Sequence, residues 1–254
     1  MPLVDTDAIV LHAFDYLESS RILRLATRDV GVQSVIAKGA RRLRARHATA
    51  IDLFAEGAAH FSLRPGRDLH TLTGFDVTRV RTGIADDLAR FSAASAIAEL
   101  MLRFGNDESQ PALYAHFAAT LDALTDCTAA DARRLALGGA WRLVGAFGFA
   151  PSMERCARCY ATVPSGDAAA FSHSEGGVLC ATCARGTPAI RLLPPAARAS
   201  IGAWLAGDDG VALDDATLRA HQRVLREFVH QHLTDGGRPL RAWDSWEQAA
   251  WAGG

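Results

Sequence analysis

The sequence AIVLHAFDYLESSRILRLATRDVGVQSVIAK, residues 8–38, holds three short apolar runs in which hydrophobic and polar side chains partly alternate. Such alternation is typical of half-buried β-strands, and an Asp-Val-Gly turn separates the second run from the third. Two more runs, 58–63 and 69–77, flank the Pro65-Gly66 pair, which is a hairpin-turn signal. Five short strands within about eighty residues favour a small barrel of the OB type. Periodicity does not settle closure, so an SH3-like barrel and an open sheet are the alternatives.

The remainder of the chain shows helical periodicity. Apolar residues recur at helical spacing, with helix-start and helix-stop residues, in the segments 84–105, 110–126, 128–149, 194–207 and 214–237. The predicted fold class is therefore α+β and multidomain, with an N-terminal OB-fold barrel followed by an all-α domain that carries an inserted four-cysteine zinc finger. We place the barrel at residues 1–80, the helical domain at 81–254 and the insertion at about 153–187.

Four of the five cysteines form two Cys-x-x-Cys pairs, and twenty residues separate the pairs. Each such turn presents two thiolates toward one point, and two turns complete a tetrahedron around Zn²⁺. The spacing fits structural zinc sites. Two disulfides and a thioredoxin-like redox pair are alternatives, which a reducing compartment and the lack of a βαβ pattern disfavour. We predict one structural Zn²⁺ held by Cys156, Cys159, Cys180 and Cys183.

Enzymatic chemistry finds little support in the sequence. A catalytic zinc keeps an open position, whereas four thiolates would fill the coordination shell. His173 and Glu175 form a His-x-Glu similar to that of zinc deaminases, but Leu179 stands where the signature has proline. We therefore interpret His173 and Glu175 as surface residues of a hairpin. The only lysine, Lys38, lacks a P-loop context, and Gly-x-Ser-x-Gly does not occur. No catalytic residue is predicted, and a zinc-dependent hydrolase or deaminase is the less favoured alternative.

The most concentrated positive charge follows the third predicted strand, although the formal net charge of the chain is only -1. Five cations fall within nine residues, and no acidic residue occurs between Asp29 and Asp52. Guanidinium groups bind phosphates through paired N–H donors, and an OB barrel with a basic surface is a common platform for single-stranded nucleic acid. The alternative is a solvated loop whose charges only aid solubility. We predict DNA binding by Lys38, Arg41, Arg42, Arg44 and Arg46.

Two sets of neighbouring residues affect how strongly such a barrel binds DNA. Arg21, Arg24 and Arg28 could extend the positive field if they share one face of their strand. Aromatic side chains could stack on bases, but alternation places most of them in the core: the set is Phe14, Tyr16, Phe54, Phe61 and Phe75. Binding is therefore expected to be largely electrostatic, with a salt slope approaching about -3.5 if all five clustered cations contact phosphates of a single strand.

The acidic pairs and the tryptophan-rich end are interpreted as structural features, and two further observations concern cellular location. The acidic pairs at 86–87 and 214–215 fall at expected helix starts, where negative charge is stabilising. The tryptophan-rich end, 241–251, is interpreted as a docking segment or a packed tail. No apolar run is long enough for a membrane span, and the N-terminus lacks the pattern of a secretory signal. A cytoplasmic location without membrane attachment is therefore expected.

The stretch 8–42 resembles the opening of the RecO family of bacterial DNA-repair and recombination mediators. The similar elements are the Glu18-Ser19 pair, the turn from Thr27 to Gly31 and the basic run from Lys38 to Arg42. The similarity continues through residues 148–159 and 171–184, so that it spans most of the chain. The basic run together with a four-cysteine module inside a helical body is more specific for this family than the basic run alone. The tryptophan-rich end departs from the family pattern.

The resemblance implies an N-terminal OB-fold, a helical domain, a four-cysteine zinc finger and a non-enzymatic role in the RecFOR pathway. Such proteins bind single- and double-stranded DNA, anneal complementary strands, and act with RecR to load RecA onto strands coated by single-stranded DNA-binding protein (SSB). Carried over by position, Lys38, Arg41 and Arg42 would contact DNA. The acidic C-terminal tail of SSB would bind the helical body, with Arg133 and Arg134 as candidates. The protein would be cytoplasmic and nucleoid-associated. A zinc-ribbon scaffold that binds proteins but not DNA is the alternative.

Overall fold

The computed structural model describes residues 2–16, 18, 20–38, 51–64, 66–233 and 239–249. Contacts between Cα atoms divide the chain into two compact units. Unit 1 comprises Met1–Cys127 and Arg241–Gly254, and unit 2 comprises Thr128–Leu240. Each unit is described by itself below. Among the described helices, none combines the length and the apolar character needed to cross a bilayer.

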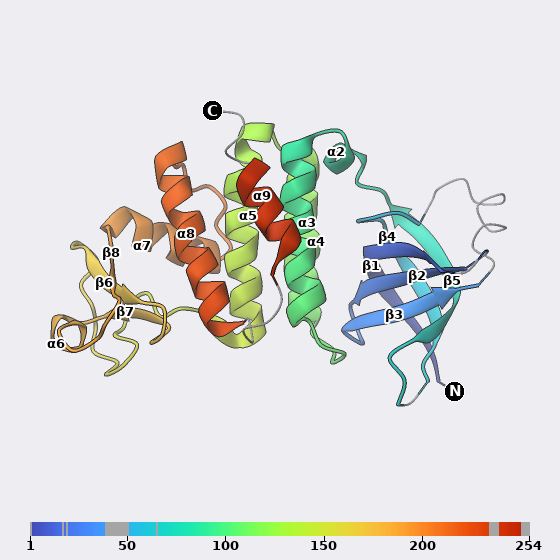
Figure 1. Cartoon of the computed structure of the whole chain (residues 1–254), viewed down its shortest axis with the longest axis horizontal. Coiled ribbons are helices and arrows are strands. Elements are labelled where there is room, and N and C mark those ends of the chain that lie inside the picture. Colours follow the sequence, from blue (N-terminus) through green and yellow to red (C-terminus); the bar gives the residue numbers. More distant parts are fainter. Residues whose placement is uncertain are drawn as a thin grey trace. The chain divides into compact units, whose positions relative to one another are not determined.

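Five of the described strands close into a barrel in unit 1 (Figure 1). The strands follow the order β1-β2-β3-β5-β4, and β4 pairs back onto β1. Neighbours are antiparallel except for β3 and β5, which pair in parallel. The closed OB-like barrel predicted from the alternating runs is therefore confirmed. Its strands are β1 Leu3–Tyr16, β2 Ser20–Thr27, β3 Val32–Ala37, β4 Glu56–Ser62 and β5 His70–Arg79.

Strand β1 contains an irregularity that changes which of its side chains face the core. Its register against β2 shifts between Val10 and His12. Val10 is buried in the barrel before the shift, whereas Ala13 packs against the barrel core after it. An extra residue in one strand reverses the alternation of faces beyond it. As a result His12, Phe14 and Tyr16 all lie on the exposed side of the strand.

The turn between β2 and β3 depends on a threonine and a glycine. Thr27 Oγ1 donates to the Gly31 carbonyl oxygen at 2.7 Å and accepts from the Val30 amide at 3.2 Å. Gly31 has a φ of +66°, which L side chains rarely adopt. A Cβ atom on Gly31 would lie 2.3 Å from the carbonyl oxygen of Asn106. The turn therefore requires glycine both for its backbone angle and for its close contact.

We expect Gly31→Ala to lower the free energy of unfolding of unit 1 by about 2–4 kcal/mol, since backbone strain and steric overlap add. Urea denaturation followed by circular dichroism measures this change. Gly66→Ala is the matched control, because Gly66 has a φ of +70° but no atom within 4 Å of its added Cβ. Equal destabilisation by the two substitutions would show that the contact with Asn106 contributes nothing.

Unit 1 also contains helices α2 Thr82–Ala85, α3 Leu88–Phe104, α4 Pro111–Asp126 and α9 Arg241–Ala249. The helical segment predicted over 84–105 is interrupted at Asp86 and Asp87, so that its main helix begins only at Leu88. The Asp87 carboxylate accepts from the Arg90 amide at 3.0 Å and caps α3, as expected for an acidic helix start. Helix α9 packs against α3 and buries Trp243 and Trp246, so this part of the tryptophan-rich end is a packed tail.

A buried arginine holds the barrel to α4 within unit 1. The Arg81 side chain is 1% exposed, and its Nη2 lies 2.6 Å from Glu56 and 2.7 Å from Asp122. Its Nη1 donates to the Phe54 carbonyl oxygen at 3.0 Å. The Tyr114 hydroxyl donates to Glu56 at 2.9 Å, and burial together with the nearby carboxylate raises the pKa of Tyr114. Because the Arg81 side chain is almost fully buried, loss of either carboxylate would leave its charge poorly compensated.

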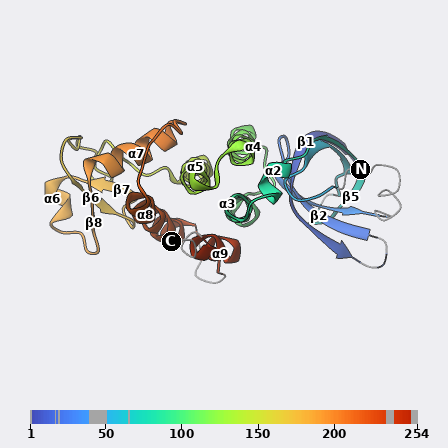
Figure 2. The same ribbon diagram turned by 90° about the horizontal axis from the view of Figure 1, so that it is seen from above.

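Unit 2 consists of helices around a core of Trp141, Trp204 and Phe228, with a small sheet attached (Figures 1 and 2). Helix α5 packs against α7 and α8. Thr128 caps α5 and Asp214 caps α8, each side chain accepting from the third amide beyond it. The strands pair in the order β7-β6-β8. The elements are α5 Ala129–Val144, η1 Gly145–Phe149, β6 Ala169–Ser172, β7 Gly177–Leu179, α6 Ala181–Ala184, β8 Arg191–Leu193, α7 Pro195–Leu205 and α8 Asp215–His232.

Candidate nucleic-acid interface and metal centre

The outer surface of β1, β2 and β3 forms a continuous strand face, which we call the outer face. Alternation in β2 sends Leu23 and Leu25 into the barrel core and places Ile22 and Arg24 on the opposite side. Across the strands, Arg24 pairs with His12 of β1 and Ser34 of β3, while Ile22 pairs with Phe14 and Ile36. The outer face therefore comprises His12, Phe14, Tyr16, Ser20, Ile22, Arg24, Ser34 and Ile36.

Two aromatic side chains are exposed on the outer face. Phe14 is 42% exposed and Tyr16 is 43% exposed. They are two residues apart on one strand, so that their Cα atoms are separated by about 6.8 Å along it. The His12 ring centroid lies 5.6 Å from that of Phe14. Bases stack on such aromatic faces with about 1–3 kcal/mol each, and every base can do so.

This exposure makes two aromatic side chains available for stacking, besides the electrostatic contacts that we expect from the sequence. Phe54 and Phe61 are buried, and Phe75 packs against the barrel core, as alternation indicates. Phe14 and Tyr16 belong to a different face. In the sequence, His12, Phe14 and Tyr16 are spaced by two residues, which is the spacing of side chains on one face of a strand. The irregularity in β1 decides that this face is the exposed one, and the sequence does not indicate that irregularity.

Positive charge adjoins these aromatic side chains. Arg24 lies on the outer face, and its Nε has no hydrogen-bond partner among the described residues. Lys38 is exposed and directly follows Ala37, the last paired residue of β3. The other four predicted DNA contacts, Arg41, Arg42, Arg44 and Arg46, lie outside the described residues and stay predictions.

The three arginines of β2 and its turn do not share one face. Arg21 lies on the same side of β2 as the core leucines, where its Nε is 3.3 Å from Asp15 and its Nη1 donates to the Ile51 carbonyl. Arg28 forms an ion pair with Asp7 at 3.2 Å. Only Arg24 of the three therefore presents its charge beside the exposed aromatic residues.

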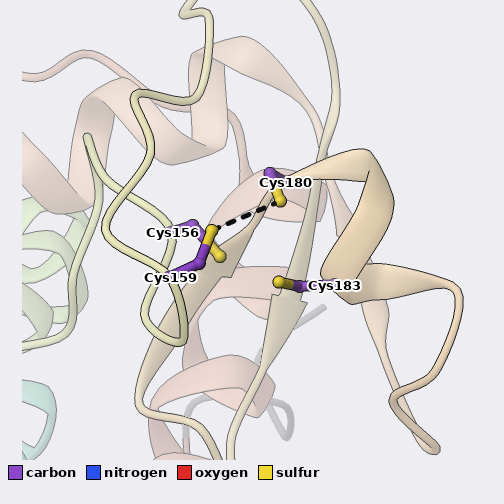
Figure 3. A group of neighbouring side chains, drawn as sticks. All are labelled: Cys156, Cys159, Cys180 and Cys183. Atoms are coloured by element: carbon purple, nitrogen blue, oxygen red, sulfur yellow. Dashed lines mark hydrogen bonds between the residues drawn. The ribbon is translucent and has the colours of Figure 1, made fainter.

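The four cysteine side chains of unit 2 converge, as Figure 3 shows. All four sulfur atoms lie within 4.8 Å of one another, and Cys159 Sγ is 3.7 Å from Cys180 Sγ. A disulfide requires about 2.05 Å. Sulfur atoms of a tetrahedral site with metal–sulfur bonds of about 2.3 Å lie about 3.8 Å apart. The cluster Cys156, Cys159, Cys180 and Cys183 therefore fits one metal ion.

Local backbone structure builds each half of this centre. The Tyr160 amide donates to the Cys156 carbonyl at 2.9 Å, and the left-handed φ of 63° at Tyr160 turns the chain back. Cys180 follows β7 and immediately precedes α6, where the Ala184 amide donates to its carbonyl at 2.9 Å. The two halves come from a tight turn and a helix start.

The thiols of the cluster differ in acidity. Burial raises the pKa of Cys156, but backbone N–H groups, including that of Cys180, lower it more, to about 6. The pKa of Cys180 is also lowered, chiefly by the backbone N–H of Cys183. The hydrogen bond with Cys180 raises the pKa of Cys183 to about 12. Metal ligation requires all four as thiolates, so metal binding would release protons.

A buried arginine fixes the metal centre to α7. Arg198 is 6% exposed and donates to the carbonyl oxygens of Met153, Val163 and Pro164. All three acceptors lie in the loop that carries the first cysteine pair. Nothing in the local sequence indicates this role, because the partners are 34 to 45 positions away.

The His-x-Glu pair takes no part in the cysteine cluster. Glu175 forms an ion pair with Arg158 at 2.6 Å. His173 is not the surface residue we expected: its side chain is 12% exposed, and its Nε2 lies 3.3 Å from the Val224 carbonyl of α8. Burial lowers the pKa of His173. The residue therefore docks the small sheet onto α8.

Arg133 and Arg134, the candidates for the SSB tail, each have an acidic neighbour. Arg133 lies 3.7 Å from Asp215, and Arg134 lies 3.2 Å from Asp131. Arg134 also lines a hollow of about 320 Å³. The hollow has an apolar wall of Ala130, Val211, Ala212, Leu213 and Leu218, and Asp131 and Asp209 also border it. The tail contact stays a prediction.

Comparison with known proteins gives two family matches. Residues 1–81 match the family described as "Recombination protein O N terminal", and residues 85–242 match "Recombination protein O C terminal". A "DNA repair protein RecO" from Syntrophotalea carbinolica is 32% identical over 242 residues, covering 93% of this chain and 91% of the relative. One from Anaeromyxobacter sp. (strain K) is 36% identical over 253 residues, covering 95% of both. These matches extend over barrel, helices and cysteine centre alike.

Proposed function

Because the chain belongs to the RecO family of DNA repair proteins, we propose that it is a non-enzymatic recombination mediator. It binds single- and double-stranded DNA, anneals complementary strands and, with RecR, helps load RecA onto SSB-coated single strands. The observation that carries the proposal is the outer face of the barrel, where exposed Phe14 and Tyr16 lie beside Arg24 and Lys38.

The chemistry of the outer face suits a single strand. Stacking on Phe14 and Tyr16 needs bases that are not already paired in a duplex. Arg24 and Lys38 supply charge for the phosphates of the same strand, and the predicted contacts of Arg41, Arg42, Arg44 and Arg46 extend it. Neither interaction reads base edges, so binding is tolerant of sequence. A mediator that acts on any damaged strand needs this tolerance.

The metal of the cysteine centre is proposed to be one Zn²⁺ with a structural role. Four thiolates are soft ligands that select zinc over hard cations such as Mg²⁺. They also fill a tetrahedral shell, which leaves no position for a substrate. The ion would hold the two cysteine-bearing halves together and would supply no reaction.

The acidic tail of SSB is proposed to bind beside Arg133 and Arg134. The hollow at Arg134 supports this, because it combines an apolar wall with a guanidinium group. Asp131 and Asp209 at its border would weaken the attraction of an acidic peptide. Tail binding would therefore depend on the apolar contacts more than on charge.

A salt titration tests the proposed function. Anisotropy of a labelled oligo-dT strand gives the affinity of wild type and of Arg41→Ala/Arg42→Ala between low and moderate salt. Loss of two phosphate contacts should lower the magnitude of the salt slope by about 1.4 and weaken binding most at low salt. Arg103→Ala/Arg241→Ala is the charge-matched control, since both side chains are exposed on helices of unit 1.

Each competing function predicts another outcome of the same titration. If the double variant binds like wild type at low salt, the basic run is not part of the interface. A protein scaffold would bind no DNA in wild type either. A zinc-dependent hydrolase would show turnover that chelation abolishes, which the mediator lacks.

A further inference from the structure

Helix α8 of unit 2 presents a second concentration of positive charge. Its buried side carries Leu218, Leu225 and Phe228. Its opposite side carries a row that we call the α8 stripe, spaced by four, three and four residues, and all of its members are exposed: Arg219, Arg223, Arg226 and His230. Helix geometry sets successive members about 4.5 or 6 Å apart along the axis. The stripe thus repeats at a spacing similar to that of phosphates along a strand.

A hollow of about 770 Å³ borders the stripe. Arg223, Arg226 and His230 line it from α8, and His173, Ser174 and Ala189 line it from the sheet and loops of the cysteine module. Among the described residues that line it, none has an aliphatic side chain larger than alanine, and the ring of His173 is mostly buried. The two arginines of this lining suit phosphate groups, which guanidinium groups bind through paired N–H donors.

One acidic residue belongs to the hollow, and its charge is already engaged. Glu227 lies 2.5 Å from Arg191 and 3.4 Å from His173 Nε2. It therefore cancels charge on Arg191 more than on the stripe. The lining therefore holds two arginines, Arg223 and Arg226, against this one carboxylate.

We propose that the α8 stripe and its hollow bind the sugar–phosphate backbone of a second DNA strand. The proposal rests on the proposed function, because annealing requires two strands to be held at once. The outer face of the barrel binds one strand by stacking and charge. The stripe binds the other by charge alone, which leaves its bases free to pair. An acidic peptide is the competing occupant, but the lining offers it no apolar anchor.

Annealing of two complementary oligonucleotides by the metal-loaded full chain tests whether the outer face and the α8 stripe bind different strands. In Arg223→Ala/Arg226→Ala the annealing rate at low salt should fall by about 10-fold or more, since two phosphate contacts are lost. Affinity for one short oligo-dT strand should change by less than about 2-fold, because that strand binds the barrel. The control Arg103→Ala/Arg241→Ala should leave both quantities within about 2-fold of wild type.

A charge-retaining variant separates electrostatics from folding. Arg223→Lys/Arg226→Lys should restore annealing to within about 3-fold of wild type, because lysine also binds phosphate as a point charge. Unchanged annealing in the alanine variant overturns the proposal, as does equal loss in both variants. If the alanine variant anneals normally but no longer binds a poly-glutamate peptide, the stripe takes an acidic peptide instead. Wild type that binds no DNA overturns the proposed function and, with it, this inference.

Discussion

We expect removal of the proposed metal ion to unfold the cysteine module, residues 153–187, while the barrel of unit 1 stays folded. Binding of structural zinc contributes about 10–16 kcal/mol, which exceeds the stability of most whole domains. Besides the ion, the module is held by two short strand pairs, by the buried side chains of Phe171, Val178 and Leu179, and by the three hydrogen bonds from Arg198.

Hydrogen exchange before and after chelation measures this effect, with a zinc-release assay alongside. Amides of β6 and β7 should lose protection, and those of β1 to β5 should keep it. Cys156→Ser should abolish stoichiometric zinc, whereas Cys127→Ser should retain one ion per chain, since Cys127 lies outside the cluster. Full protection of the module after complete metal release would refute the structural role.

We expect truncation of both exposed aromatic residues, Phe14→Ala/Tyr16→Ala, to lower the affinity for single-stranded DNA by about 30-fold or more. Stacking contributes about 1–3 kcal/mol per base, and two stacked bases are lost. The salt slope should not change, because no phosphate contact is removed. Stability should change little, since both side chains are more than two-fifths exposed.

The matched control for this pair is Leu3→Ala/Leu88→Ala. Both leucines are 73% exposed, and both belong to unit 1. Anisotropy titrations of an oligo-dT strand should find the control indistinguishable from wild type. Equal losses in the two double variants would mean that the outer face is not where bases stack.

The sequence predicts the barrel and the cysteine centre well because both depend on local patterns. Strand alternation and turn residues mark each strand of the barrel, and the spacing of two Cys-x-x-Cys turns marks the metal site. The structure adds that Gly31 is required by a contact with Asn106, which local pattern does not indicate.

Features that depend on distant partners escape the sequence. The irregularity in β1 reverses the alternation, so that Phe14 and Tyr16 are exposed rather than buried. Arginine is usually exposed, but Arg81 and Arg198 are buried and hydrogen-bond to residues that are distant in the sequence, such as Asp122 and Val163. The acidic pair at 86–87 indicates a helix start, but the apolar period continues across it, so that the expected helical segment extends back to Ile84.

Photo-crosslinking tests the central claim, that bases of single-stranded DNA lie on the outer face of the barrel. An oligonucleotide that contains 5-bromodeoxyuridine is irradiated with the full chain, and the cross-linked peptides are identified by mass spectrometry. The account predicts cross-links at Phe14 and Tyr16 that disappear in Phe14→Ala/Tyr16→Ala. Cross-links confined to unit 2, or unaffected by the double substitution, would contradict it.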